Sequence, residues 1–144
     1  MNSKLPVDLK VIEIPNEKGY HIYIQCVLNQ TNITCLIDTG ASKSVFDKKR
    51  IKNILKKTPK KSDNYGIGIS KKRFSSSSIS FDLMIGELKI PDYEASCIDL
   101  STVNDSLSIA GISPIDGIIG GDILYKYKAV IDYKKKKLFL YKPS

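Results

Sequence analysis

The sequence has no tryptophan, a single histidine, His21, and only three cysteines. Cys26, Cys35 and Cys97 are widely spaced and form no CxxC pair, which argues against a zinc site of the usual Cys/His type. We therefore expect buried, unpaired cysteines, and neither a metal nor another cofactor. The chain also lacks an apolar run long enough to cross a bilayer, so we expect no membrane partner.

The N-terminal residues are polar overall and contain no apolar stretch of the kind found in a secretory signal. We accordingly expect a cytoplasmic protein. The chain has 144 residues, of which 42% are hydrophobic, and this suits one globular domain spanning residues 1–144. We find no internal repeat and no linker that would divide it.

The net charge is +8, and lysine far outnumbers arginine. A basic chain can attract nucleic acid or another polyanion, but phosphate-binding sites favour arginine for bidentate contacts. No basic motif with interleaved aromatic residues is present. The simpler interpretation is a set of solvated lysine faces, so we do not expect nucleic acid as a partner.

Short segments of alternating apolar and polar residues recur, separated by Gly, Pro, Asn, Asp and Ser, which is typical of an all-β fold. The pattern predicts strands over residues 7–14, 20–28, 33–37, 44–46, 79–85 and 88–100, and a last hairpin over 129–141. Asp47 is predicted to cap a helix over residues 48–57. A second short helix is predicted around Leu124, whereas residues 101–114 are predicted to form a loop.

Asp38-Thr39-Gly40 directly follows an apolar strand and carries the clearest chemical signal. Hydrolysing a peptide without a metal, serine or cysteine requires a nucleophilic water and an acid for the leaving group. Two adjacent carboxyl groups can supply both, because their like charges cannot both ionise cheaply and one stays protonated. Gly40 lacks a Cβ, so main-chain N–H groups can approach the carboxylates. We therefore predict that Asp38 is one of two catalytic carboxyls.

The surrounding residues support the same hypothesis. Thr39 offers a hydroxyl that can hold two active-site loops together, and Ala41 is small enough to pack beneath the loop. A second apolar-apolar-Gly run, Ile118-Ile119-Gly120, occurs later and is followed by the second predicted helix and the last hairpin. The two motifs together are more specific than an isolated Asp-Thr-Gly.

The chain resembles the retropepsin-type aspartic proteases, which include the retroviral proteases and their single-domain cellular and bacterial relatives. The match consists of residues 36–42, Leu-Ile-Asp-Thr-Gly-Ala-Ser, and residues 117–124, Gly-Ile-Ile-Gly-Gly-Asp-Ile-Leu. This resemblance implies a closed acid-protease β-barrel with one or two short helices. It also implies that Ile118, Ile119 and Gly120 pack behind the catalytic loop.

The resemblance further implies that Thr39 joins hydrogen bonds across a dimer and that Gly40 lines the main chain of a peptide substrate. The segment Tyr65-Gly66-Ile67-Gly68 lies where such proteins carry a substrate-binding flap, although its composition equally suits a surface loop. Retroviral enzymes often carry arginine after the second motif, whereas this chain has Gly121, which leaves Asp122 to cap the helix.

The chain contains one Asp-Thr-Gly, so the second carboxyl is expected from a second copy in a homodimer. The predicted function is aspartic endopeptidase activity on a peptide or protein substrate. The alternative is a catalytically inactive module of the same fold that serves dimerisation or peptide binding.

Overall fold

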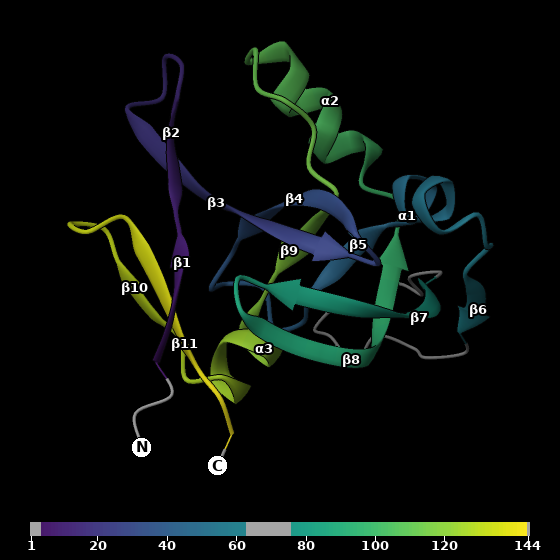
Figure 1. Cartoon of the computed structure of the whole chain (residues 1–144). Helices are drawn as coiled ribbons and strands as arrows, with labels where there is room; N and C mark the ends of the chain where they lie inside the picture. The colour runs from purple at the N-terminus through teal and green to yellow at the C-terminus, as the bar shows by residue number, and fades with distance from the viewer. Residues whose placement is uncertain (1–3, 63–75, 144) are drawn as a thin grey trace.

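The computed structural model describes residues 4–62 and 76–143 and is mostly β (Figure 1). The strands are β1 (Lys4–Asp8), β2 (Lys10–Ile14), β3 (Gly19–Leu28), β4 (Thr31–Ile37), β5 (Val45–Asp47), β6 (Lys60–Ser62), β7 (Ser76–Ile85), β8 (Leu88–Ile98), β9 (Gly117–Ile119), β10 (Val130–Asp132) and β11 (Lys137–Tyr141). The helices are α1 (Lys48–Leu55), α2 (Ser101–Ile109) and α3 (Gly121–Lys126). The predicted flap residues, Tyr65 to Gly68, lie outside the described residues.

The strands form an eight-stranded sheet in the order β2-β3-β4-β9-β5-β8-β7-β6 and a three-stranded sheet in the order β1-β11-β10. Strand β3 also pairs with β7, so the larger sheet curls back on itself. Strands β6 and β7 pair as Lys60↔Ser78 to Ser62↔Ser76, on either side of the segment that contains the predicted flap. The predicted mostly β fold is thus confirmed, with three short helices in place of one or two.

The main core lies inside the curled sheet because its strands bury alternate residues. On β4, the inward side chains are Ile33, Cys35 and Ile37, all of which are buried. Phe46 on β5 and Ile119 on β9 belong to the same cluster and are fully buried. The strands that lead to and from the predicted catalytic loop are therefore anchored in the core.

Strand β9 lies between β4 and β5, and this arrangement positions the predicted site. It pairs in parallel with β4, as Leu36↔Ile118 and Ile37↔Ile119, and antiparallel with β5, as Val45↔Ile118. The chain leaves β4 at Asp38, passes across the end of β9 and returns in β5. The predicted catalytic loop thus encloses the second predicted motif.

Helix α1 confirms the predicted cap. The Asp47 carboxylate accepts a hydrogen bond from Arg50 N at 3.1 Å and another from Leu100 N at 2.8 Å. Such a side chain satisfies N–H groups that the first helical turn leaves unpaired. The helix ends at Leu55, two residues earlier than predicted, because Lys56 adopts a left-handed conformation with φ of 57°.

Two predictions of local structure were wrong. Residues 7–14 form two strands rather than one, because the chain passes from the smaller to the larger sheet at Leu9. Helix α2 occupies much of the predicted loop 101–114, and its buried residue Leu107 packs with Tyr23 and Ile115 in a second hydrophobic cluster. The polar sequence of α2 gives a weak helical signal, so tertiary packing determines its conformation.

Among the described residues, no helix has the length and apolar character needed to cross a membrane.

Candidate active site

Asp38 is the first residue after β4, and its side chain is exposed. Its backbone N–H donates to Ile119 O at 3.0 Å, which ties the start of the loop to β9. Gly40 N donates to the Asp38 carboxylate at 2.9 Å, and Ala41 N donates to Asp38 O at 3.2 Å. These bonds form a tight turn that presents the carboxylate to solvent. Thr39 and Gly40 are exposed beside it.

The Ile118-Ile119-Gly120 segment lies against the predicted catalytic loop. Ile119 is fully buried, while Ile118 is half-buried beside Leu36 and Val45 in the second cluster. A Cβ on Gly120 would lie 2.6 Å from Ala41 O, so only glycine allows the two backbones to approach this closely.

A hydrogen-bond network that the sequence did not reveal joins the loop to α3. The Asp122 carboxylate accepts bonds from Ser44 N at 2.8 Å, Ser44 Oγ at 2.7 Å and Ile123 N at 2.9 Å. The buried Ser44 Oγ in turn accepts from Gly120 N at 2.8 Å. Asp122 was predicted to cap the helix, but the N-cap of α3 is Gly120 and Asp122 lies in the first turn, from which it bonds to the far end of the loop. No sequence signal pointed to Ser44.

Tyr93 lies beside this network, close to Ser44 and Asp122. Burial raises the pKa of Tyr93, and the neighbouring Asp122 carboxylate raises it further, so the phenol stays protonated. The ring also makes edge-on contacts with Phe46 and Phe81, at centroid distances of 6.0 and 5.9 Å. The loop is thus supported by a rigid aromatic group as well as by hydrogen bonds.

We expect Ser44→Ala to destabilise the protein by roughly 1–3 kcal/mol, because the buried Gly120 N–H would lose its acceptor. Urea unfolding followed by circular dichroism measures the change. Ser42→Ala is the matched control, since Ser42 is exposed on the same loop and should change stability by less than about 0.5 kcal/mol. Equal unfolding midpoints for the two variants would contradict the structural role of Ser44.

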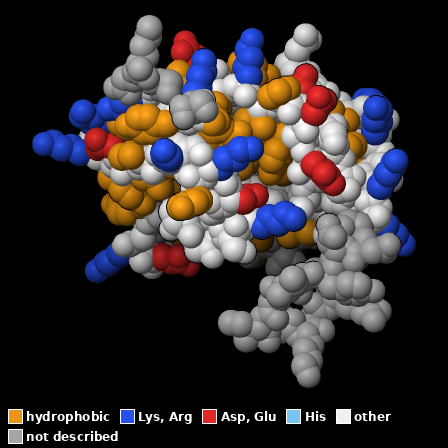
Figure 2. Space-filling view, turned by 90° about the horizontal axis from the view of Figure 1, so that it is seen from below, with side chains coloured by type: hydrophobic (Ala, Val, Ile, Leu, Met, Phe, Trp, Pro, Cys, Tyr) orange, Lys and Arg blue, Asp and Glu red, His pale blue; other side chains and the backbone are white. Residues whose placement is uncertain are grey.

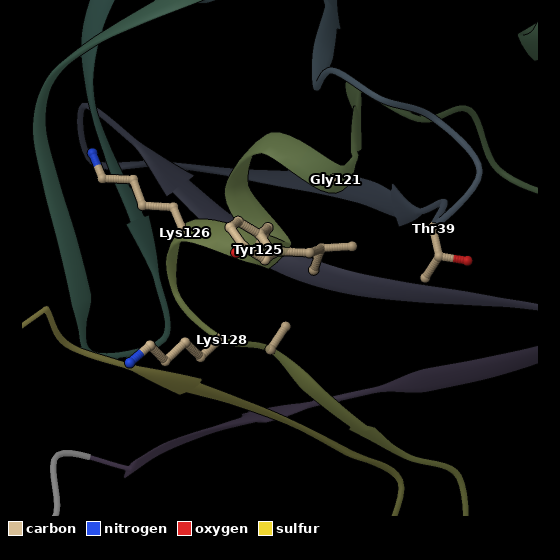
Figure 3. A pocket seen from close by; sticks show the side chains of 7 residues that line it. Thr39, Gly121, Tyr125, Lys126 and Lys128 are labelled. Carbon is tan, nitrogen blue, oxygen red and sulfur yellow. The ribbon is translucent and has the colours of Figure 1, made fainter.

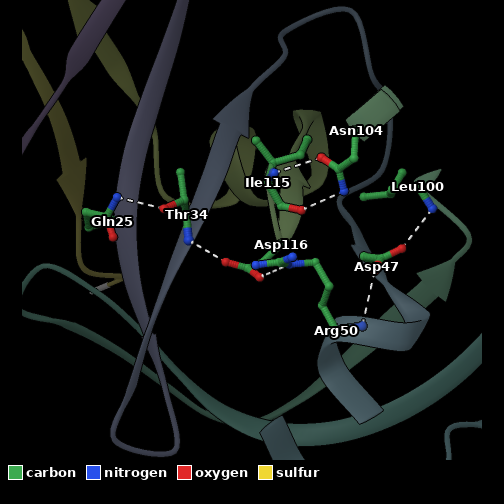
Figure 4. Close-up of polar contacts among 8 residues, drawn as sticks. All are labelled: Gln25, Thr34, Asp47, Arg50, Leu100, Asn104, Ile115 and Asp116. Carbon is green, nitrogen blue, oxygen red and sulfur yellow. Dashed lines mark hydrogen bonds and ion pairs between the residues drawn. The ribbon is translucent and has the colours of Figure 1, made fainter. Parts of the chain in front are cut away.

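A second polar network lies at the start of β9 (Figure 4). The buried Asp116 carboxylate accepts from Thr34 N at 2.8 Å and forms an ion pair with Arg50 on α1. The Asn104 side chain forms two hydrogen bonds with the backbone of Ile115. It donates to Ile115 O at 3.1 Å and accepts from Ile115 N at 2.8 Å. An Arg–Asp support pair is thus present, although not at the position after Gly120 where retroviral enzymes often carry arginine.

Two depressions meet at Thr39. One, of about 270 Å³, includes Asp38 and Thr39 and is lined on its other sides by Tyr20, His21, Ile22, Ile37, Ile131 and Tyr133. The other, of about 530 Å³, lies between Thr39 and α3 and is lined further by Gly121, Leu124, Tyr125, Lys126, Lys128 and Ala129 (Figure 3). Among the residues that the structure describes, neither lining contains a carboxylate besides that of Asp38.

His21 lies in the Asp38 depression, where its Nδ1 is 3.2 Å from the Tyr23 hydroxyl. Burial raises the pKa of Tyr23, so its phenol remains protonated and can donate to Nδ1. The direction of this bond depends on the tautomer of the His21 ring. The sequence analysis gave His21 no role.

The three cysteines are buried and free, as predicted. Burial raises the pKa of Cys97 to about 11. Hydrogen bonding with Cys26, followed by burial, raises the pKa of Cys35 well above its usual value. Because the thiolate is the reactive form, neither of these two thiols suits nucleophilic catalysis.

Within residues 4–62 and 76–143, no group of three or more His, Cys, Asp or Glu side chains is arranged to hold a metal ion.

Comparison with known proteins gives a family match over most of the chain. A family model described as aspartyl protease matches residues 24–123. A search of curated proteins finds no match.

Two solved structures share the fold. A retropepsin-like aspartic protease from Rickettsia conorii is similar with a TM-score of 0.57 and 20% identity, covering 97% of this chain and 91% of that chain. The retroviral protease-like domain of Ddi1 from Leishmania major has a TM-score of 0.54 and 20% identity, covering 84% of this chain and 93% of that chain. The predicted retropepsin-like fold is therefore confirmed.

Proposed function

The chain belongs to the aspartyl protease family, and on this basis we propose that it is an aspartic endopeptidase whose active site forms across a homodimer. The observation that carries the proposal is the exposed carboxylate of Asp38, held by Gly40 N at the end of β4. In the part of the chain that the structure describes, no second carboxylate lines the depression around it, and hydrolysis by this chemistry requires two. A two-fold axis beside Thr39 would bring the second Asp38 into place.

In the proposed reaction the two Asp38 carboxyls share one proton and hold a water between them. The ionised carboxylate takes a proton from the water, whose oxygen attacks the carbonyl carbon of the scissile peptide bond. The protonated carboxyl donates its proton to the carbonyl oxygen. Collapse of the resulting diol breaks the C–N bond as the protonated carboxyl donates its proton to the leaving amine. A hydroxyl of the diol passes its proton to the other carboxylate, so the pair again shares one proton.

The other predicted site residues have supporting roles in this proposal. Gly40 N–H stabilises the charge on Asp38 and leaves room for a peptide main chain. The exposed Thr39 hydroxyl is available for hydrogen bonds across the two-fold axis. Ala41 O accepts from Gly121 N at 2.7 Å, so α3 holds the far side of the turn. Ile118, Ile119 and Gly120 form a rigid support behind the loop.

An inactive module that only dimerises or binds peptides would have the same fold. The two functions are separated by incubating the folded dimer with a diverse peptide library across acidic to neutral pH and identifying products by mass spectrometry. Cleavage at defined bonds supports the endopeptidase. Binding without any cleavage would favour the inactive module.

We expect specific activity to depend on protein concentration, because a monomer holds only one catalytic carboxyl. On dilution below the dimer dissociation constant, activity per chain should fall in proportion to the dimer fraction measured by light scattering. Asp38→Asn should follow the same dimer curve, because the two side chains have nearly the same shape. A stable monomer with undiminished activity would rule out a site shared between two chains.

A further inference from the structure

We propose that the second copy docks on four exposed side chains near Thr39 and does so without exchange of terminal strands. These side chains, here called the aromatic rim, are Tyr20, Tyr125, Val130 and Tyr133. This inference rests on the proposed function, since it names the partner surface of the same site. The occupant is a second copy of this chain because, among the described residues, the depression around Asp38 holds only one carboxylate. Docking of a different protein there would leave the site without its second Asp38.

The rim concentrates the apolar surface of the molecule at one place. Five large hydrophobic side chains are exposed in the described part of the chain, and four of them belong to the rim. Their exposed fractions are 59% for Tyr20, 88% for Tyr125, 48% for Val130 and 59% for Tyr133. Aromatic residues are enriched at protein interfaces, where they provide large contact areas. The fifth, Ile109 on α2, belongs to neither depression beside Thr39.

Three of the four rim residues line the two depressions that meet at Thr39, and the fourth, Val130, lies on β10 beside them. Tyr20 and Tyr133 line the Asp38 depression, and Tyr125 lines the depression between Thr39 and α3. Val130 lies between Ala129, which belongs to the second depression, and Ile131, which belongs to the first. Seen from below, the molecule shows hydrophobic side chains gathered on the side that carries β10, β11 and α3 (Figure 2). A partner on this surface would therefore contact the turn that carries Asp38.

The nearby lysines are compatible with such docking. Lys126 and Lys128 line the depression beside α3, but their ammonium groups point away from Thr39 (Figure 3). They can therefore remain in water at the edge of an interface while the apolar surface next to Thr39 is covered. This arrangement avoids burying like charges across a two-fold axis.

The terminal strands are already paired within one chain. Strand β11 lies between β1 and β10, so both of its edges are hydrogen-bonded. Its pairing with β1 runs from Lys4↔Tyr141 to Asp8↔Lys137, and the latter residues also form an ion pair. Exchange of terminal strands between two copies would break this ladder. Strand β10 is an edge strand, so it can add a partner without losing existing bonds.

Charge placed on the rim tests the proposal. We expect Tyr125→Glu and Val130→Glu each to raise the dimer dissociation constant at least about 30-fold in sedimentation equilibrium. Neither residue lines the Asp38 depression, so the readout does not depend on substrate contacts. Ile109→Glu is the matched control, since it changes an equally exposed apolar side chain on α2 and should leave the constant within about twofold. A dimer unaffected by both rim changes but weakened by Ile109→Glu would overturn the inference.

Cross-linking provides a second test that does not disturb the interface. In an Asp38→Asn background, Val130→Cys should form a covalent dimer with a flexible bifunctional maleimide, whereas Ile109→Cys should not. The native cysteines are buried, and the Asp38→Asn chain without an added cysteine measures any cross-linking through them. Cross-linking through Ile109→Cys alone would place the interface elsewhere. The two proposals can fail separately. A wild-type dimer that uses the rim but cleaves no peptide would refute the endopeptidase and support the interface. An active dimer that does not use the rim would refute the interface and support the endopeptidase.

Discussion

Asp38→Asn is expected to reduce peptide cleavage by at least about 1,000-fold, the contribution typical of a general acid–base group. The amide is nearly isosteric with the carboxylate and can still accept the bond from Gly40 N, so the fold and the turn should persist. It cannot take a proton from water, and two such groups cannot share a proton. The kcat/KM for a fluorogenic peptide measures the loss, with circular dichroism and light scattering to confirm an intact dimer.

Asp105→Asn is the matched control, because Asp105 is an exposed carboxylate on α2 and should leave activity unchanged. A mixing experiment sharpens the test. If equal amounts of wild type and Asp38→Asn exchange subunits freely, only about a quarter of the dimers carry both carboxyls. Activity should fall to about that fraction of the value for the same total concentration of wild type. Activity that falls only to one half would indicate that each chain acts alone, and full activity of Asp38→Asn would refute the assignment.

Gly120→Ala is expected to be the most destabilising small substitution near the site, costing about 3 kcal/mol or more. The added Cβ would lie 2.6 Å from Ala41 O and 3.0 Å from Lys43 C, both of which are backbone atoms in the loop after Asp38. Relief of this overlap requires the loop and β9 to separate, which would stretch the bond from Gly120 N to Ser44 Oγ. Activity should fall as well, because the Asp38 turn would move. Urea unfolding and the peptide assay measure the two effects.

Gly121→Ala is the natural comparison for this change. A Cβ at Gly121 would lie 3.5 Å from both Ala41 O and Ser42 O, which is an ordinary contact distance. Gly121 is also the first residue of α3, where alanine is well tolerated. We therefore expect at most a small stability change. Similar losses for the two adjacent variants would show that close packing at Gly120 is not what holds the loop.

The sequence predicted those parts of the fold that depend on local pattern. Alternation of apolar and polar residues indicated β3, β4 and the last hairpin, because one face of each strand is buried. Asp47 indicated the start of α1, since a carboxylate cap leaves a recognisable local signal. Helix α2 was missed because its single buried residue, Leu107, is stabilised by partners that are distant in the sequence.

The candidate site shows the same division. The motif at residues 38–40 and the run at 118–120 were recognisable from the sequence because the proposed chemistry requires a carboxyl, a hydroxyl and small residues in a fixed order. The two segments lie next to each other because β9 pairs with both β4 and β5, and this pairing joins strands that are distant in the sequence. The support from Ser44 and Asp122 depends on a contact between residues 78 positions apart, which carries no local sequence signal.

The sequence by itself therefore indicated the chemistry that we propose, through Asp38-Thr39-Gly40, and led to the proposal of a second copy, through the single occurrence of that motif. Only the tertiary structure decided how the Asp38 turn is held and which surface surrounds it. The aromatic rim consists of residues from β3, α3, β10 and the turn after β10. Each of its residues looks unremarkable within its own segment. Their common role can be inferred only because the folded sheets bring them together around Thr39.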